Sequence, residues 1–133
     1  MLRLIFLTLS LLFAVICTSE ADSYLLTLNH KRLYKWDGKY LLTTNHQRLY
    51  RWDGTYIINT SHKRLYQWDG TYLKNMNHQR LYQWDGKYLK NMNHQRLFKI
   101  KDSFITDMNH RRLYRIDGHI PIALLIALAT GTL

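Results

Sequence analysis

The sequence has few of the residues that cross-link a chain, interrupt it or charge it negatively. It holds one cysteine, one proline and nine acidic residues, against 19 Lys and Arg, for a net charge of +10. A single cysteine excludes an internal disulfide, so a folded domain must be stabilised by its own packing. One proline excludes a proline-rich linker. The shortage of carboxylates predicts attraction to anionic partners through a long-range, salt-sensitive force.

The first 21 residues predict a secretory signal peptide. A positively charged start precedes an apolar run that ends at Cys17, and Ser19 and Ala21 place small residues at the −3 and −1 positions of a cleavage site. An N-terminal membrane anchor, the alternative, would need about 20 apolar residues. We therefore expect residues 1–21 to be removed, giving an extracellular chain that begins at Asp22. Secretion argues against nucleic acid as the partner.

Six copies of a 16-residue unit occupy residues 22–119. The consensus is Asn-His-x-Arg-Leu-Tyr-x-Trp-Asp-Gly-x-Tyr-Leu-x-x-Met, and the array opens with a half-unit, Ser23–Leu28. Near-identity of the copies indicates recent duplication, so we expect any activity to be repeated in each copy. The arginines of the Arg-Leu-Tyr or Arg-Leu-Phe motif recur every 16 residues at Arg32, Arg48, Arg64, Arg80, Arg96 and Arg112.

Each unit predicts a β-hairpin. Asp-Gly between aromatic and aliphatic residues is a strong hairpin signal, because glycine accepts the positive φ of a tight turn. Asn-His would close the opposite end as a second two-residue turn. The predicted fold is all-β: tandem hairpins forming an antiparallel meander, a hairpin solenoid, or a closed barrel or ring. On this register one face carries Arg80, Tyr82, Trp84, Lys87, Leu89 and Asn91.

A helical alternative also fits part of the pattern. Leu81, Trp84, Tyr88 and other apolar residues of one repeat fall on a single stripe of a helical wheel. However, Asp85 lands inside that stripe, and Gly86 would lie mid-helix at a cost of about 1 kcal/mol. The β interpretation is therefore preferred.

The aromatic and basic columns are the candidate ligand-binding residues. Equivalent residues of successive hairpins in a sheet stand about 9.5 Å apart, so they would form a ladder suited to stacking on sugar rings, bordered by cations for anionic groups. The competing interpretation is that the rings form the core. The candidates are Trp36, Trp52, Trp68, Trp84, Tyr34, Tyr50, Tyr66, Tyr82, Arg32, Arg48, Arg64, Arg80 and Arg96; Tyr40, Tyr56, Tyr72 and Tyr88 belong to the same aromatic set.

The remaining polar columns do not suggest catalysis. The turn position accounts for the repeated aspartates, and one equivalent Asp per repeat lacks the differentiated carboxylate pair of a glycosidase. The six histidines would lie too far apart to share a metal, so we expect a graded response to pH instead. We predict no enzyme activity, no metal and no cofactor. Asn59 begins an N-glycosylation sequon.

These observations predict a secreted multivalent binder of carbohydrate or anionic polymers, with a membrane surface as a further candidate partner. One alternative is a matrix or adhesive protein whose repeats self-associate by edge pairing. Another is a multi-copy peptide precursor, since Lys31-Arg32, Lys63-Arg64 and Arg111-Arg112 offer dibasic cleavage points. Residues 120–133 form an apolar tail, expected to be a cap strand or a membrane-associating anchor.

Overall fold

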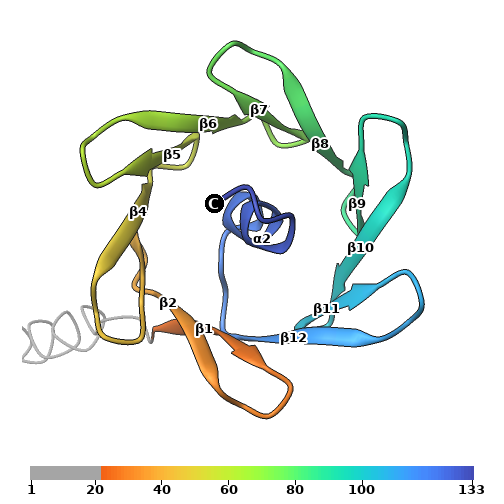
Figure 1. The fold of residues 1–133 in the computed structure, drawn as a ribbon, viewed down its shortest axis with the longest axis horizontal. Coiled ribbons are helices and arrows are strands. Elements are labelled where there is room, and N and C mark those ends of the chain that lie inside the picture. Colours follow the sequence, from red (N-terminus) through yellow and green to blue (C-terminus); the bar gives the residue numbers. More distant parts are fainter. Residues whose placement is uncertain (1–21) are drawn as a thin grey trace, which may run out of the picture.

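The computed structural model describes residues 22–133, so the predicted signal peptide lies outside the described residues. Twelve antiparallel strands follow one another as short hairpins and close into a barrel around one short helix (Figure 1). The all-β hairpin-repeat prediction is confirmed, and the closed barrel is the arrangement adopted. The elements are β1 (Ser23–Thr27), β2 (Arg32–Trp36), β3 (Tyr40–Leu42), β4 (Arg48–Trp52), β5 (Tyr56–Asn59), β6 (Arg64–Trp68), β7 (Tyr72–Asn75), β8 (Arg80–Trp84), β9 (Tyr88–Asn91), β10 (Arg96–Lys101), β11 (Phe104–Asp107), β12 (Arg112–Asp117) and α2 (Ile122–Ala129).

The opening half-unit closes the ring. Strand β1 pairs with β2 on one side and with β12 on the other, with Leu25 opposite Ile116. The array therefore ends where its first strand can complete the last hairpin. Closure pairs both sheet edges, which an open meander of this length would leave exposed.

The turn at the Asp-Gly end lies one residue further along than expected. Trp36 pairs with Leu41, and the Asp37 N–H donates to the Tyr40 carbonyl (3.2 Å), so the two turn residues are Gly38 and Lys39. Gly38 has φ +98°, a conformation that only glycine adopts readily. The Asp37 Oδ1 atom accepts the N–H groups of Lys39 (2.9 Å) and Tyr40 (2.7 Å). Aspartate thus precedes the turn and caps it with its side chain.

The opposite end is a three-residue loop and not the two-residue Asn-His turn that was predicted. In the loop after β7, the Asn75 N–H donates to the Gln79 carbonyl (3.0 Å), which makes Met76, Asn77 and His78 the three loop residues. His78 has φ +63°, so histidine and not asparagine takes the left-handed position. This is the type I turn followed by a left-handed residue that is common in three-residue hairpin loops. The prediction failed because several residue types, including Asn and His, tolerate positive φ.

A β-bulge at the Leu of every Arg-Leu-Tyr motif sets which residues face inwards. In the pairing of β7 with β8, Tyr82 lies opposite Leu73 and Arg80 lies opposite Lys74, so Leu81 is the extra residue. A bulge breaks the two-residue alternation, and the residues beyond it change face. Tyr82 therefore faces the lumen while Arg80 faces outwards, which corrects the prediction that both share a face. The same register shift occurs in the other five copies.

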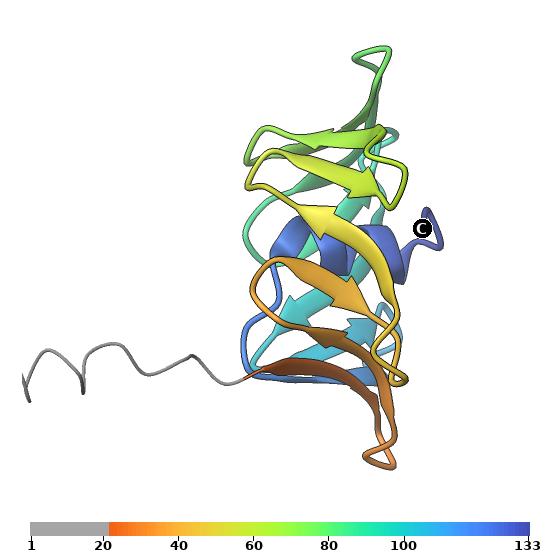
Figure 2. The same cartoon turned by 90° about the vertical axis from the view of Figure 1, so that its left-hand side faces the viewer.

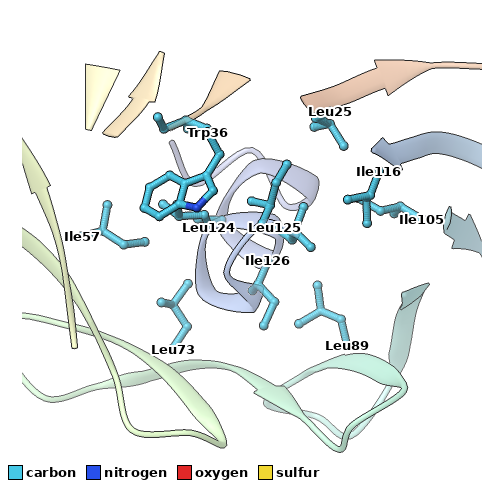
Figure 3. Packing of buried hydrophobic residues seen from close by; sticks show 13 residues of the cluster. Leu25, Trp36, Ile57, Leu73, Leu89, Ile105, Ile116, Leu124, Leu125 and Ile126 are labelled. Atoms are coloured by element: carbon cyan, nitrogen blue, oxygen red, sulfur yellow. The ribbon is translucent and has the colours of Figure 1, made fainter. Parts of the chain in front are cut away.

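The core consists of rings of equivalent side chains around α2 (Figure 3). The innermost ring is aliphatic and almost completely buried, at most 3% exposed: Leu25, Leu41, Ile57, Leu73, Leu89 and Ile105. Half-buried aromatic residues of the strands that begin with the Arg-Leu-Tyr motif pack against this ring. A barrel of about eight strands is filled by its own side chains, and wider barrels enclose a cavity. In this twelve-stranded barrel the helix occupies the lumen (Figure 2).

The apolar tail forms α2 and not the expected cap strand. Its eight residues are hydrophobic on all sides, which suits a helix surrounded by protein. Leu124, Ile126 and Ala127 are completely buried. Pro121 precedes the first turn, and the Thr132 N–H donates to the Ala127 carbonyl (2.9 Å) past Gly131, closing the last turn. In the described part of the chain, no helix has the length and hydrophobicity to cross a membrane.

Candidate binding surface

The predicted Trp and Tyr columns face the lumen. Trp36 is buried, and Trp52, Trp68 and Trp84 are half-buried and pack against the core. The tyrosines of the Arg-Leu-Tyr motifs are also half-buried and contact the same cluster: Tyr34, Tyr50, Tyr66 and Tyr82. The structure therefore brings these eight residues together as packing around α2. A row of rings that stacks on a polymeric ligand would have to lie on the outer wall, and these rings lie on the inner side.

The motif arginines lie on the outer wall, and each stacks on an aromatic ring of the preceding strand. All six are exposed, and the guanidinium carbon lies 3.9–4.1 Å from the ring centroid. The bulge makes this contact, because it turns the arginine to the face that carries the second-strand ring. The pairs are Arg32–Tyr24, Arg48–Tyr40, Arg64–Tyr56, Arg80–Tyr72, Arg96–Tyr88 and Arg112–Phe104.

These guanidinium groups have no acidic partner within residues 22–133. The ion pairs there join other residues: Lys35 to Asp22, Lys74 to Asp69, Lys90 to Asp85 and Arg111 to Asp107, at 3.0–3.3 Å. A ring fixes the plane of each guanidinium and leaves its edges free to donate. Such an edge matches a carboxylate, sulfate or phosphate by two parallel hydrogen bonds.

A second set of cations surrounds the barrel on the same face. The third residue after each motif arginine forms a cross-strand pair with a residue of the adjacent strand. Each of the six pairs contains one Lys or Arg, which lies on the first strand in some copies and on the second in others. The pairs are Lys35–Leu42, Arg51–Ile58, Gln67–Lys74, Gln83–Lys90, Lys99–Thr106 and Arg115–Leu26.

The repeated aspartates lie at the Gly-turn end of the hairpins, whereas Asp107 lies at the loop of the opposite end. Desolvation by burial opposes ionisation of Asp69, but the N–H groups of Tyr72 and Thr71 and the Lys74 ammonium outweigh it and lower its pKa to about 2. The same balance of burial against backbone N–H donors lowers the pKa of Asp53 and Asp85. Acid groups therefore serve the turns, and the outer wall keeps an excess of positive charge.

The other predicted residues occupy the loops at the opposite end. The six histidines are exposed, and the loops that carry them project outwards around the ring (Figure 1). In residues 22–133 no three His, Cys, Asp or Glu side chains are grouped as a metal site would require. Asn59 starts a loop, and its Oδ1 atom accepts the N–H groups of Ser61 (3.0 Å) and Lys63 (2.9 Å).

The rings beneath the arginines and the second set of cations were not among the predicted ligand-binding residues. A signal for the cations was present. From one copy to the next, the basic residue moves between two positions, those of residues 35 and 42 in the first unit. Where one position is neutral the other is basic, so each copy keeps one cation. That exchange has meaning only once the two positions are known to be cross-strand neighbours. Arg112, which stacks on Phe104, was also omitted from the candidate set.

Comparison with known proteins finds no matching family model, no matching curated protein and no matching solved structure.

Proposed function

We propose that the chain is a secreted multivalent binding protein whose outer wall holds an acidic polysaccharide. The observation that carries this proposal is the sixfold repetition of an exposed arginine stacked on an aromatic ring and free of acidic partners within residues 22–133. Arginine recognises anions by geometry as well as charge, and stacking reduces the entropy lost when a ligand binds.

Repetition around the ring supports a polymeric ligand. A single exposed arginine binds an anion weakly in water, but linked sites raise the overall affinity by roughly 10² to 10⁴ when one ligand spans several of them. The six stacks are equivalent and lie on adjacent hairpins of one closed sheet. An extended chain with an anion on each unit can therefore contact several stacks at once, whereas a small anion contacts one.

The alternative of a matrix protein that self-associates by edge pairing lacks a surface in the described residues. Edge pairing needs a strand with unpaired N–H and C=O groups. In residues 23–117 each strand has two neighbours, because β1 pairs with β12. Self-association of the barrel would have to use side chains instead.

Titration calorimetry with dextran sulfate tests the proposal, with uncharged dextran as the control ligand. We expect the protein to bind dextran sulfate and not uncharged dextran. Salt should weaken this binding because it screens exposed charges. A variant with Arg64→Gln and Arg80→Gln should bind at least roughly tenfold more weakly. A variant with Lys39→Gln and Lys87→Gln loses the same charge near the Gly-turn end, away from the Arg64 and Arg80 stacks, and should lose much less affinity.

Equal losses in the two variants would show that net charge alone drives binding and would overturn the role of the stacks. Tighter binding to vesicles of anionic phospholipid or to DNA than to dextran sulfate would overturn the assignment to a polysaccharide.

A further inference from the structure

Histidine occupies a strained backbone position in every loop between hairpins. The six residues have φ between 63° and 66°, in the left-handed region: His30, His46, His62, His78, His94 and His110. Glycine adopts this conformation without steric cost, and asparagine more easily than most residues. Among the three loop residues, only histidine is shared by all six copies.

Two clefts on the outer wall place such a histidine beside strand cations. One, of about 290 Å³, is lined by His62 together with Tyr40, Arg48 and Arg51. The other, of about 190 Å³, is lined by His110 together with Lys99, Lys101, Asp102 and Arg112. In both, the cation of the cross-strand pair (Arg51 or Lys99) lies on the strand that pairs with the one leading into the loop, and a motif arginine borders the cleft.

At the equivalent position of the first loop, the strand cation and the loop histidine are in direct contact. The Arg115 Nη1 atom lies 3.3 Å from the His30 Nδ1 atom. Because a guanidinium has no acceptor, Nδ1 accepts this hydrogen bond.

The other three loops lack this arrangement. Before His78 and His94 the cation of the cross-strand pair is Lys74 or Lys90, and each is already paired with a turn aspartate, Asp69 at 3.0 Å or Asp85 at 3.3 Å. Lys35, the corresponding residue before His46, is already paired with Asp22 at 3.2 Å. The described chain therefore divides its six histidines into three with a free strand cation and three without.

We infer that the clefts of His62 and His110, and the equivalent position where Arg115 contacts His30, each bind a sulfate-ester group of an acidic polysaccharide, and that protonation of the histidine strengthens the binding. This inference rests on the proposed function and names the group that the wall recognises. In the His62 cleft, donors come from Arg48, Arg51 and the imidazole on a separate hairpin. Three donors from different directions match the three terminal oxygens of a sulfate ester, whereas a planar carboxylate is satisfied by one guanidinium.

The direction of the pH effect follows from the charges around each histidine. Arg48 and Arg51 line the His62 cleft and Lys63 follows His62 in the chain, so an anion bound there lies among several positive groups. Bound sulfate supplies that anion and stays ionised at all pH values used, so proton and sulfate binding favour each other. Imidazoles gain their proton between about pH 8 and 5.

The His110 cleft should be the weakest of the three. Asp102 also lines it and repels an anion. Arg111, which follows His110, is already paired with Asp107 at 3.1 Å. At His30, Arg115 makes the contact and Lys31 follows in the chain.

The test is calorimetric titration with dextran sulfate at pH 7.5 and 5.5 and constant ionic strength. For the wild-type chain we expect roughly tenfold tighter binding at pH 5.5, because charge-assisted hydrogen bonds form at several linked sites. The triple variant His30→Asn, His62→Asn and His110→Asn should lose this increase. The matched control, His46→Asn, His78→Asn and His94→Asn, removes as many imidazoles and should keep most of it. Asparagine tolerates positive φ, so both variants should fold.

The possible results separate the two proposals. Wild-type chain that binds dextran sulfate at neither pH would overturn the proposed function. Wild-type chain that binds, but with an equal pH dependence in both triple variants, would overturn the histidine clefts alone. Carboxymethyl dextran of matched charge density serves as a second probe. If it showed the same affinity and the same dependence on His30, His62 and His110, the assignment to sulfate would be wrong.

Discussion

The Arg-Leu-Tyr tripeptide assigns two tasks to the two faces of the sheet. Tyr82 and its equivalents turn inwards onto the core, and Arg80 and its equivalents turn outwards onto the second-strand rings. The leucine between them is the bulged residue that allows both. Without the bulge, arginine and tyrosine would share one face, and either a charge would enter the lumen or a core ring would leave it.

Acid stability should depend on the turn aspartates. The pKa of Asp69 is lowered below its ordinary value of 3.8 to about 2, and those of Asp53 and Asp85 are also lowered. A lowered folded-state pKa contributes stability that is fully present above about pH 4 and is lost as pH falls towards 2. Urea unfolding of the variant Asp53→Asn, Asp69→Asn, Asp85→Asn should therefore show a smaller loss of stability between pH 4 and 2 than the wild type. An unchanged pH dependence would contradict the role of these carboxylates.

The left-handed histidine should be replaceable by glycine and not by a β-branched residue. His78 has φ +63° and is exposed, so a change there alters backbone strain more than packing. His78→Gly should leave the free energy of unfolding unchanged or raise it by up to about 1 kcal/mol. His78→Val should lower it by about 1–2 kcal/mol. Denaturant unfolding measures both, and equal effects would show that φ does not govern this position.

At the scale of elements, the sequence predicts the hairpins from local signals, but it does not predict the register in which their strands pair. Asp-Gly with flanking aromatics predicts hairpins because turn chemistry acts within four residues. The bulge was missed because Arg-Leu-Tyr reads as ordinary alternation, and only pairing with Leu73 and Lys74 reveals the extra residue. The helix at residues 122–129 was not predicted because a short apolar run has no periodicity that distinguishes a strand from a buried helix. Whether the Trp columns lie inside or outside depends on closure of the ring, which no single repeat contains.

Departures from the repeat consensus coincide with the entry of α2 into the barrel. Ile116 stands where four copies have tryptophan, and it lines a hollow with Ile120, Ile122 and Leu125. Gly118 follows, and a side chain there would collide with Ser23, whose hydroxyl accepts the His119 N–H at 2.9 Å. Ile116 in place of tryptophan, together with the glycine that this copy shares with the consensus, leaves room for the chain to pass from β12 into the lumen.

Restoring the consensus at this point should therefore destabilise the protein. Ile116→Trp would overfill the space beside Ile122 and Leu125 and should lower the free energy of unfolding by about 1–3 kcal/mol. The reverse change in another copy, Trp84→Ile, should also be destabilising because it leaves a cavity in the packing around the helix. Thermal unfolding compares the two variants with the wild type. A more stable Ile116→Trp variant would contradict this account of the helix entry.

At the scale of the whole molecule, the barrel and its helix depend on each other. Three rings of side chains line the lumen, and an eight-residue helix is too short to be stable alone in water. Tyr66 on the barrel wall donates to the Thr132 carbonyl (3.4 Å), so the end of the tail is also attached. Closure of the sheet and insertion of the helix should form one cooperative unit.

Removal of the tail should expose the lumen. A chain ending at His119 keeps all twelve strands but loses the groups that pack against Leu41, Ile57 and Leu73. We expect binding of a hydrophobic dye and a broad thermal transition in place of a cooperative one. A chain ending at Thr130 keeps the helix and serves as the control. Cooperative unfolding of the chain ending at His119 would show that the barrel does not need its helix.

The central claim is that arginines on the outer wall bind the ligand while tryptophans in the lumen hold the fold. The most direct measurement is the affinity for dextran sulfate of a variant with Trp52→Phe, Trp68→Phe and Trp84→Phe, below its unfolding temperature. The account predicts a lower Tm with an affinity within about twofold of wild type, because these rings pack against the core. An unchanged Tm with binding reduced tenfold or more would show that the tryptophans are the ligand-binding residues, and would contradict the account.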